Sequence, residues 1–351
     1  MELELSVAEE IADASMGRPH VVILGAGCSL AAFPNGDRGG KRLPLMDNLV
    51  QVLGLETSLQ AANFLDPPRN FEALYSRLAG DDHYADLRST IEGAVTKYFA
   101  QMALPGDPTI YDHLLLSLRP KDCVATFNWD PFLWDAWERV QRQGLTPKPP
   151  KVFFLHGNVR IGICHEHKRY GPVSACCPKC ERDFIPSRLL FPVEHKDYAA
   201  DAFVRDQWNG LRQHLKNAWM VTIFGYGAPK SDVEAVGLMR EAWGDTSDRN
   251  LEQIEIIDIK PKDELSETWS DFIHTHHYQT ATDFYGSWIA NHPRRTCEAM
   301  WQQLMECRFV NSNLIPWNLG WSELRKWARP LLEAEVAANP PAAADEPEAN
   351  P

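Results

Sequence analysis

The chain has 351 residues, 44% of them hydrophobic, which is enough to bury a large core and favours one large domain with insertions over two domains. Its formal net charge of -13, with no long run of Lys or Arg, argues against direct contact with nucleic acid or an anionic membrane. The N-terminal sequence is acidic, and no stretch has the roughly 20 apolar residues of a membrane helix. We therefore expect a cytoplasmic protein without a signal peptide or membrane span.

Five short apolar runs predict the strands of a sheet. They are rich in β-branched and aromatic residues and lack regular polar alternation, as expected for parallel strands that are covered on both faces. Helical periodicity in the segments between the later runs gives the alternation of an α/β fold. The runs are residues 21–24, 123–127, 152–155, 220–224 and 254–259.

The remaining segments suggest how the chain is organised. Apolar residues recur at three- and four-residue spacing between the first two runs, which predicts a helical insertion at about residues 45–118. We expect residues 18–283 to form the main domain, 284–335 a tryptophan-rich helical segment, and 336–351 a disordered tail. The tryptophans of the helical segment either pack it against the sheet or form an interface with another chain.

Ligands of open α/β sheets bind outside the carboxyl ends of the strands, so the residues that follow each run matter most. The first run leads into a glycine turn, Gly25 to Ser29, which lets backbone amides approach a pyrophosphate at a helix start. The third glycine of the dinucleotide fingerprint is replaced by Leu30, which disfavours an ordinary dehydrogenase. The alternative is a glycine turn that only packs helix on strand.

Polar residues or glycines also follow the other four runs. Asn128 and Asp130 follow the second run, His156 follows the third, and glycines follow the fourth, with Ser231 and Asp232 shortly after them. The fifth run carries Asp258, whose carboxylate is suited to accept hydrogen bonds from ribose hydroxyls. The predicted site comprises Gly25, Ala26, Gly27, Ser29, Phe127, Asn128, Asp130, His156, Gly225, Tyr226, Gly227, Asp232 and Asp258.

A short segment holds four of the eight cysteines and predicts a metal site. Cys164-x-x-His167 and Cys177-x-x-Cys180 each supply two adjacent vertices of a tetrahedral zinc site. Four protein ligands leave no open position, so the metal is expected to be structural and to hold together a small module at about residues 161–183. The spacing leaves open Cys176 in place of Cys177 and His165 in place of His167.

In chain order, GAGCS at 25–29, TFNWD at 126–130, LHG at 155–157, the Cys/His quartet and FGYG at 224–227 resemble the sirtuin, or silent-information-regulator-like, superfamily. The resemblance extends over about residues 21–283. It implies a Rossmann-like parallel sheet that binds NAD, with a helical insertion, a small zinc module and, in this chain, additional C-terminal helices.

The resemblance also implies roles for three residues. Asn128 and Asp130 would hold the nicotinamide end of NAD, and His156 would be the catalytic base. Nicotinamide leaves NAD without help from a general acid, so the site needs only to stabilise an oxocarbenium-like centre and to deliver a nucleophile. A neutral imidazole, with a reference pKa of about 6.5, accepts a proton from ribose or water at physiological pH.

Two departures from protein deacylases favour a different reaction. GAGCS continues into LAAFPNGDRGGKRLP rather than the glycine-isoleucine-proline-aspartate-phenylalanine-arginine run of deacylases, and RLLFPVEHKDY replaces the peptide-docking segment after the zinc module. With NFEALYSRL, YDHLLLSLRP and YGAPKSDVEA, the chain looks more like divergent bacterial sirtuin-like domains, many of which degrade NAD in antiphage defence. Both departures argue against recognition of acyl-lysine.

The first hypothesis is therefore an NAD glycohydrolase that releases nicotinamide and ADP-ribose, acts in antiphage defence and is switched on by assembly. A homo-oligomer or a partner defence protein would provide that switch, and a glycine-rich loop at 34–43 could move over the site. The alternatives are an NAD-dependent protein deacylase or ADP-ribosyltransferase, and a non-catalytic nucleotide-sensing subunit. The sequence does not distinguish NAD from NADP.

Overall fold

The computed structural model describes residues 3–193, 198, 201–229, 232–245, 249, 251–270, 272–273 and 277–338. Within these residues, no helix is long and apolar enough to cross a membrane. The predicted tail lies outside the described residues except for 336–338, which end the last helix.

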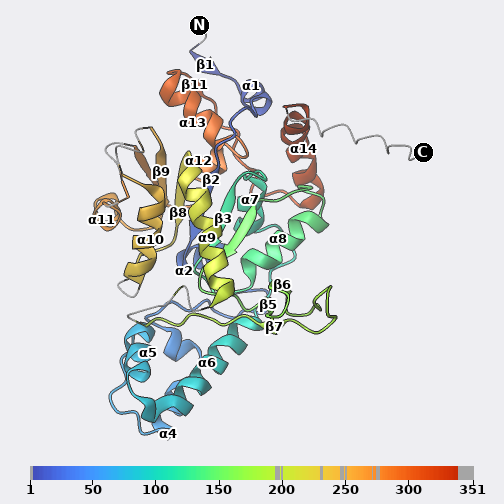
Figure 1. Cartoon of the computed structure of the whole chain (residues 1–351). Coiled ribbons are helices and arrows are strands. Elements are labelled where there is room, and N and C mark those ends of the chain that lie inside the picture. Colours follow the sequence, from blue (N-terminus) through green and yellow to red (C-terminus); the bar gives the residue numbers. More distant parts are fainter. Residues whose placement is uncertain are drawn as a thin grey trace, which may run out of the picture.

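A six-stranded parallel sheet forms the centre of the fold, in the order β10-β9-β8-β2-β3-β4 (Figure 1). The four inner strands are fully buried, as their continuous apolar runs predict. The chain order runs outward in both directions from the β2 and β8 pair, as in a Rossmann-like sheet. The strands are β2 (His20–Leu24), β3 (Cys123–Thr126), β4 (Lys151–Phe154), β8 (Met220–Phe224), β9 (Gln253–Ile257) and β10 (Tyr278–Ala281).

The two edge strands differ from the expectation. In β4, Lys151 is exposed and the next two residues are half-buried, because this strand has a neighbour on one side only. The sequence analysis missed β10, whose YQTA is half-buried throughout and lacks an apolar run. The α/β fold with a parallel sheet is confirmed, and the sheet has one more strand than predicted.

A helical insertion separates β2 from β3 and projects from one end of the sheet (Figure 1). Its last helix, α7, packs instead against the main body, where it contacts α2, α8 (Phe132–Arg142) and α12 (Trp288–Asn291). The helices from α2 to α7 are α2 (Ala26–Ala32), α3 (Leu49–Val52), α4 (Glu56–Ala61), α5 (Phe71–Ala79), the 3-10 helix η1 (Asp82–Tyr84), α6 (Ala85–Ala100) and α7 (Ile110–Leu116).

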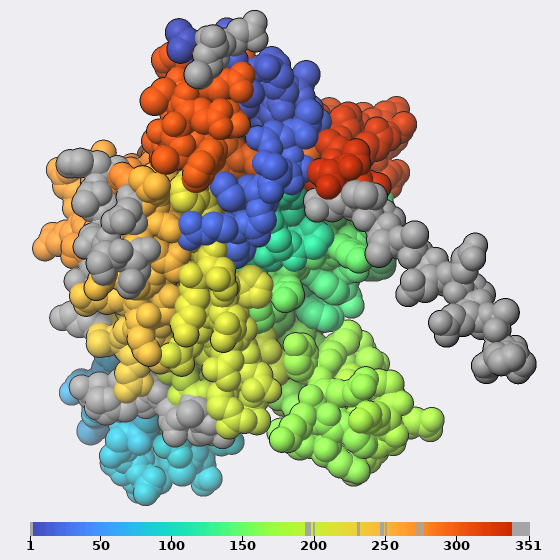
Figure 2. All heavy atoms as spheres, turned by 45° about the horizontal axis from the view of Figure 1, so that its top comes forward, coloured from blue at the N-terminus to red at the C-terminus, as the bar shows by residue number. Residues whose placement is uncertain are grey.

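The connections between the later strands are helical. Helix α9 packs on β3, β4 and α10, and Figure 1 shows it in front of the sheet. The Cys/His segment forms a separate antiparallel sheet in the order β6-β5-β7, which Figure 2 shows as a green projection beside the cyan insertion. These elements are α8 (Phe132–Arg142), β5 (Ile161–Cys164), β6 (Arg169–Pro172), β7 (Ile185–Pro186), α9 (Ala202–Asn217), α10 (Val233–Trp243) and α11 (Lys262–Thr268).

The N- and C-terminal segments pack together at the amino ends of the strands. β1 pairs in parallel with β11, and α1 contacts α14; Figure 2 shows the blue N-terminal segment against the orange and red C-terminal helices. The elements are β1 (Glu4–Leu5), α1 (Val7–Ala12), α12 (Trp288–Asn291), α13 (Thr296–Met305), β11 (Phe309–Val310) and α14 (Trp321–Ala338).

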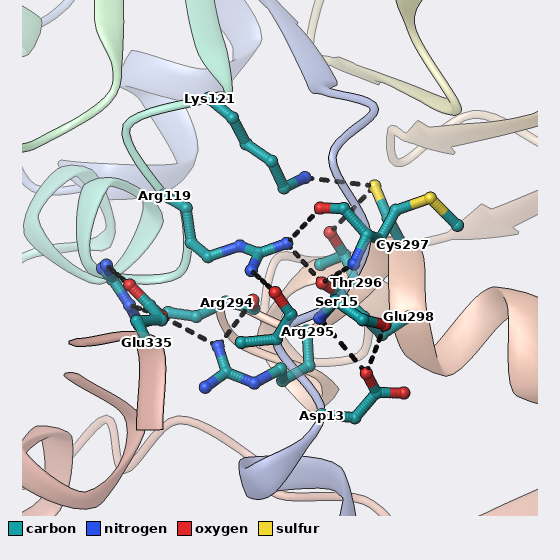
Figure 3. Close-up of polar contacts among 12 residues, drawn as sticks. Asp13, Ser15, Arg119, Lys121, Arg294, Arg295, Thr296, Cys297, Glu298 and Glu335 are labelled. Atoms are coloured by element: carbon teal, nitrogen blue, oxygen red, sulfur yellow. Dashed lines mark hydrogen bonds and ion pairs between the residues drawn. The ribbon is translucent and has the colours of Figure 1, made fainter. Parts of the chain in front are cut away.

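A buried network of ion pairs fixes the C-terminal helices in place (Figure 3). The guanidinium groups of Arg294 and Arg295 both donate to Glu335 on α14, at 2.7 to 2.8 Å. Arg119 pairs with Glu298 on α13 and donates to the backbone oxygen of Met16 at 2.9 Å. Because a buried charge that loses its partner is costly, these contacts hold the N-terminal segment, α13 and α14 in one arrangement.

Most of the tryptophans in the C-terminal segment take part in this packing. Four of the five are partly buried against the core, and Trp317, which is 62% exposed, is the exception. Packing therefore accounts for four of the five tryptophans, and only Trp317 of this group stays largely exposed. The four packed residues are Trp288, Trp301, Trp321 and Trp327.

Candidate functional site

A cavity of about 420 Å³ lies at the carboxyl ends of the strands, where the sheet order reverses between β2 and β8. This is where open α/β sheets bind nucleotides, and the volume is in the range of cofactor sites. The structure brings all thirteen residues of the predicted site to the wall of this one cavity: Gly25, Ala26, Gly27, Ser29, Phe127, Asn128, Asp130, His156, Gly225, Tyr226, Gly227, Asp232 and Asp258. Ser231 lies outside the described residues.

Two glycine turns meet at the floor of the cavity. The Gly27 amide donates to the backbone oxygen of Gly225 at 2.9 Å, and Gly225 has a φ of +60°. A Cβ atom on Gly225 would lie 2.3 Å from the backbone nitrogen of Cys28, and one on Gly25 would lie 2.5 Å from the Gly225 oxygen. The glycines are thus needed for backbone contact between the two turns, and the Gly27 amide is engaged within the protein.

Gly225→Ala is expected to lower the free energy of unfolding by about 2–4 kcal/mol, because it combines a left-handed backbone with a clash against backbone atoms. Gly227→Ala is the matched control in the same turn, since a Cβ atom there meets nothing within 4 Å. Denaturant unfolding of both variants measures the difference. Equal stability of the two variants would show that the turns do not require this close approach.

Asn128 and Asp130 belong to a buried hydrogen-bond network with Ser29 and Tyr111. The Asn128 Nδ2 group donates to the Gly25 oxygen at 2.9 Å and to Ser29 Oγ at 3.1 Å. Ser29 Oγ donates to Asp130 Oδ2 at 2.6 Å and lies 2.6 Å from the Tyr111 hydroxyl. With its donors directed into the protein, Asn128 has its side-chain oxygen available as an acceptor.

Asp130 also holds the loop that follows β3. Its Oδ1 accepts from the Phe132 amide at 3.2 Å, and its backbone oxygen accepts from Asn158 Nδ2 at 2.7 Å. Burial raises the pKa of Asp130 from 3.8 to about 6, against the opposing effect of the Ser29 hydrogen bond. These contacts support a positioning role for Asp130.

The raised pKa gives stability a defined dependence on pH. Because the folded protein binds this proton more tightly than the unfolded chain does, the contribution of Asp130 is complete below about pH 4 and is lost as the pH rises through about 6. Asp130→Asn should remove this loss. The free energy of unfolding of the variant minus that of the wild type should therefore increase by up to roughly 3 kcal/mol from pH 4 to pH 7. Chemical denaturation across that range tests it, and parallel curves would contradict it.

His156 follows β4 and lies among aromatic side chains. Its Nε2 is 3.2 Å from the Tyr198 hydroxyl and 3.8 Å from Asp232 Oδ1, and Asp232 also accepts from the Tyr226 hydroxyl at 3.0 Å. The Phe127 ring stacks on Tyr226 with centroids 4.1 Å apart and meets the His156 ring edge-on. The imidazole is therefore held on the cavity wall, 5% exposed and close to a carboxylate.

The sequence analysis missed most of the apolar wall of the cavity. Most of it comes from residues 43–49, the helices α5 and α6, and the segment after β7, none of which follows directly after a strand of the sheet. Trp129, in the loop after β3, is the exception. Tyr111 was also missed, because nothing in an apolar helix marks one tyrosine for the site. The missed lining residues include Leu43, Pro44, Leu45, Met46, Leu49, Glu72, Phe99, Trp129, Leu190 and Pro192.

The four metal-ligand candidates come together in the small antiparallel sheet. Their ligand atoms all lie within 4.8 Å of one another, in the set Cys164, His167, Cys177 and Cys180. Cys164 Sγ is 3.7 Å from Cys180 Sγ and 3.5 Å from His167 Nδ1. A tetrahedral zinc ion separates two sulfur ligands by about 3.8 Å and a sulfur and a nitrogen by about 3.6 Å. The cluster is thus compatible with structural zinc.

The structure also decides between the neighbouring candidates. Cys176 is exposed, and its thiol donates a hydrogen bond to Asp183 Oδ1 at 3.2 Å, outside the cluster. His165 is not in the cluster either. The residues after the two ligand pairs, Lys168 and Glu181, both have a left-handed φ, which turns each pair back toward the centre.

The fold and the cavity together define an α/β protein with a cavity at the switch point of a parallel sheet. No family model matches the sequence, and no curated protein is significantly similar to it. Solved structures that it resembles include a Sir2 homologue in complex with NAD, at 13% identity and a TM-score of 0.41, with 93% of this chain and 94% of the other covered.

A Sir2 homologue mutant bound to ADP-ribose is 14% identical, with 93% and 97% of the two chains covered and a TM-score of 0.36. A third structure, described in a study of the mechanism and regulation of Sir2 enzymes, is 14% identical, with 85% and 96% covered and a TM-score of 0.40. With identities this low and TM-scores below 0.5, these likenesses carry no argument about function, and the chemistry rests on the residues of this chain.

Proposed function

We propose that the protein is an NAD glycohydrolase that cleaves NAD to nicotinamide and ADP-ribose. The observation that carries the proposal is the single cavity whose wall holds all thirteen residues selected from the strand ends, Asn128 and His156 among them. The sirtuin resemblance of the sequence supports NAD as the ligand of that cavity. The departures from the deacylase pattern favour water over acyl-lysine as the nucleophile.

Asn128 positions the reacting ribose or the attacking water. Its donors are used by Gly25 and Ser29, so its side-chain oxygen is the group directed to substrate, and it would accept from a ribose hydroxyl or from water. Asp130 acts through Ser29. It accepts a hydrogen bond from the Ser29 hydroxyl, and this hydroxyl in turn accepts one from the Asn128 amide group. Asp258, at the end of β9, would accept from the hydroxyls of the adenosine ribose.

His156 accepts the proton that the nucleophile loses. A neutral imidazole on the cavity wall is suited to this step, and the neighbouring carboxylate of Asp232 would stabilise the imidazolium that forms. The Phe127 ring, which stacks on Tyr226, packs edge-on against the imidazole on one side. A site that only bound nucleotide would have no use for a base.

The test is incubation of the full chain with NAD, with nicotinamide and ADP-ribose followed by chromatography. The expected result is equimolar release of both products without any acceptor. Parallel incubations contain an acyl-lysine peptide or protein acceptors. If NAD is consumed only when an acceptor is present, with one acceptor modified for each NAD, the reaction is deacylation or ADP-ribosyl transfer and not hydrolysis. If NAD binds without turnover, the protein is a nucleotide sensor.

The proposal extends to an effector of antiphage defence that is silent until it assembles, because an unrestrained NAD hydrolase would drain the pool of its own cell. The loop at 34–43 is a poor switch, since the Asp37 carboxylate accepts from the backbone amides of Gly39, Lys41 and Ala103 at 2.8 to 2.9 Å. Exposed apolar side chains at the terminal segments, Leu3, Phe309 and Trp317, are the better candidates for contact with another chain.

Activity per chain is therefore expected to rise at least about tenfold on assembly or on addition of the product of a neighbouring gene. Light scattering alongside the NAD assay relates the rate to the assembly state. Equal rates per chain in monomeric and assembled protein would rule out this form of control while leaving the hydrolase proposal intact.

A further inference from the structure

A second cavity lies between helices α5 and α6 of the insertion, and the proposed reaction does not use it. Its volume of about 390 Å³ is in the range of small-molecule sites. Room for it exists because the two helices present small side chains there, Ala79 at the end of α5 and Ala85 at the start of α6. Arg188 and Val193, in the chain after β7, form another side of the cavity, which is open to solvent at the exposed residues Ser89 and Arg188.

Two arginines line this cavity from different parts of the chain, Arg88 on α6 and Arg188 after β7. Both guanidinium groups act on the Tyr75 hydroxyl, where they lower a pKa that burial raises well above its usual range. Among the residues that the structure describes, neither arginine forms an ion pair. In a chain with a net charge of -13, two such cations on one cavity favour an anionic ligand.

The other polar groups of the cavity add hydrogen-bonding capacity. Glu92 follows Arg88 by four residues on α6, a spacing that commonly forms an ion pair, yet its carboxylate accepts from the Tyr75 hydroxyl instead. Its second oxygen has no hydrogen-bond partner in the described part of the chain, so it can accept from a ligand hydroxyl. Ser89 contributes a hydroxyl at the same place.

We propose that this cavity binds a small organic phosphate that carries hydroxyl groups, as a sugar phosphate or a nucleotide does. Arg88 and Arg188 bind the phosphate through the paired donors of their planar guanidinium groups, which match phosphate oxygens. Glu92 accepts from a hydroxyl of the sugar. This site is separate from the cavity at the sheet, and its ligand is not consumed.

The two cavities share a wall. On α5, Glu72 lines the first cavity and Tyr75 lines the second. After β7, Pro192 lines the first cavity and its neighbour Val193 lines the second. A phosphate compound that binds the protein must therefore be assigned to one cavity or the other by variants of each.

The probe is ribose 5-phosphate, titrated into the full chain and followed by calorimetry, with inorganic phosphate and ribose as separate arms. We expect saturable binding of one molecule per chain, weaker binding of inorganic phosphate, and no binding of ribose. The double variant Arg88→Gln with Arg188→Gln should bind ribose 5-phosphate at least about tenfold more weakly. The double variant Lys326→Gln with Arg329→Gln, at two exposed cations on α14, is the charge-matched control and should bind as the wild type does.

A second variant tests hydroxyl recognition. Glu92→Gln keeps an oxygen for Tyr75 but removes the charge, so ribose 5-phosphate should lose its advantage over inorganic phosphate. The proposal fails if the wild type shows no saturable binding, or if inorganic phosphate binds as tightly as ribose 5-phosphate. It also fails if Asn128→Ala abolishes binding while the double arginine variant retains it, because the phosphate would then occupy the first cavity.

Discussion

Asn128→Ala and His156→Ala are each expected to lower the rate of nicotinamide release by about 10²- to 10⁴-fold, with the fold unchanged. Asn128→Ala removes the side-chain oxygen that, in the proposed mechanism, accepts a hydrogen bond from the ribose or from water. His156→Ala removes the imidazole that lies 3.8 Å from the Asp232 carboxylate. Both side chains lie on the cavity wall, so their loss should affect turnover more than stability.

The measurement is the turnover number at saturating NAD, with circular dichroism and thermal unfolding to confirm the fold. Asn217→Ala is the control for an asparagine outside the site, since its side chain is exposed at the end of α9 and donates to the Gln213 oxygen. A variant of Asn128 or His156 that keeps near-normal turnover would remove that residue from the mechanism. Loss of turnover in Asn217→Ala would point to general damage instead.

The polar half of the candidate site could be predicted because its residues follow directly after buried strands. Each apolar run marks a strand, and a parallel sheet brings the carboxyl ends of its strands to one edge. Gly25, Asn128, His156, Gly225 and Asp258 come from five strands spread over most of the chain, and they line one cavity. That inference needs only strand positions and no knowledge of the packing.

The apolar half could not be predicted in this way. Leu45, Leu49, Phe99 and Pro192 reach the cavity because the insertion and the segment after β7 fold over the sheet edge. Their patterns are those of ordinary core or loop residues. The edge strand β10 was missed for a related reason, since its half-buried residues have neither a continuous apolar run nor a clear alternation.

The metal site shows where spacing stops being informative. Cys176 and Cys177 are adjacent, so their distances in sequence from the other candidate ligands differ by only one residue. The sequence therefore did not decide which of the two binds the metal. In the structure, Cys176 forms a backbone bridge with Asp183, and neighbouring residues in extended chain direct their side chains to opposite sides. Cys177 therefore faces the cluster, and Cys176 faces away.

The small module is expected to depend on its metal for stability. Its own buried cluster consists of Cys164, Cys177 and Phe184, which is too little apolar surface to offset the entropy of ordering the segment. Two of these three residues are themselves metal-ligand candidates. Zinc binding would therefore supply most of the folding free energy of the module.

Elemental analysis is expected to find about one zinc per chain, bound by Cys164, His167, Cys177 and Cys180. Cys180→Ser should abolish this zinc and open the module, so that backbone amides at about residues 161–186 exchange at least about tenfold faster with solvent. Cys176→Ser is a matched control four residues away, because the Cys176 thiol is hydrogen-bonded to Asp183 and is not part of the cluster. It should retain both zinc and protection from exchange.

The effect of Cys180→Ser on NAD cleavage should be indirect. The module joins the main body next to the loop that holds Asn158, whose amide donates to the Asp130 oxygen and whose backbone oxygen accepts from Ser187. Opening of the module would loosen this loop, and turnover would fall as a consequence of local unfolding. Removal of zinc by a chelator should then reduce protection from exchange before activity declines. Carefully purified protein that contains no zinc, or a Cys180→Ser variant with unchanged exchange, would show that the cluster is not a structural metal site.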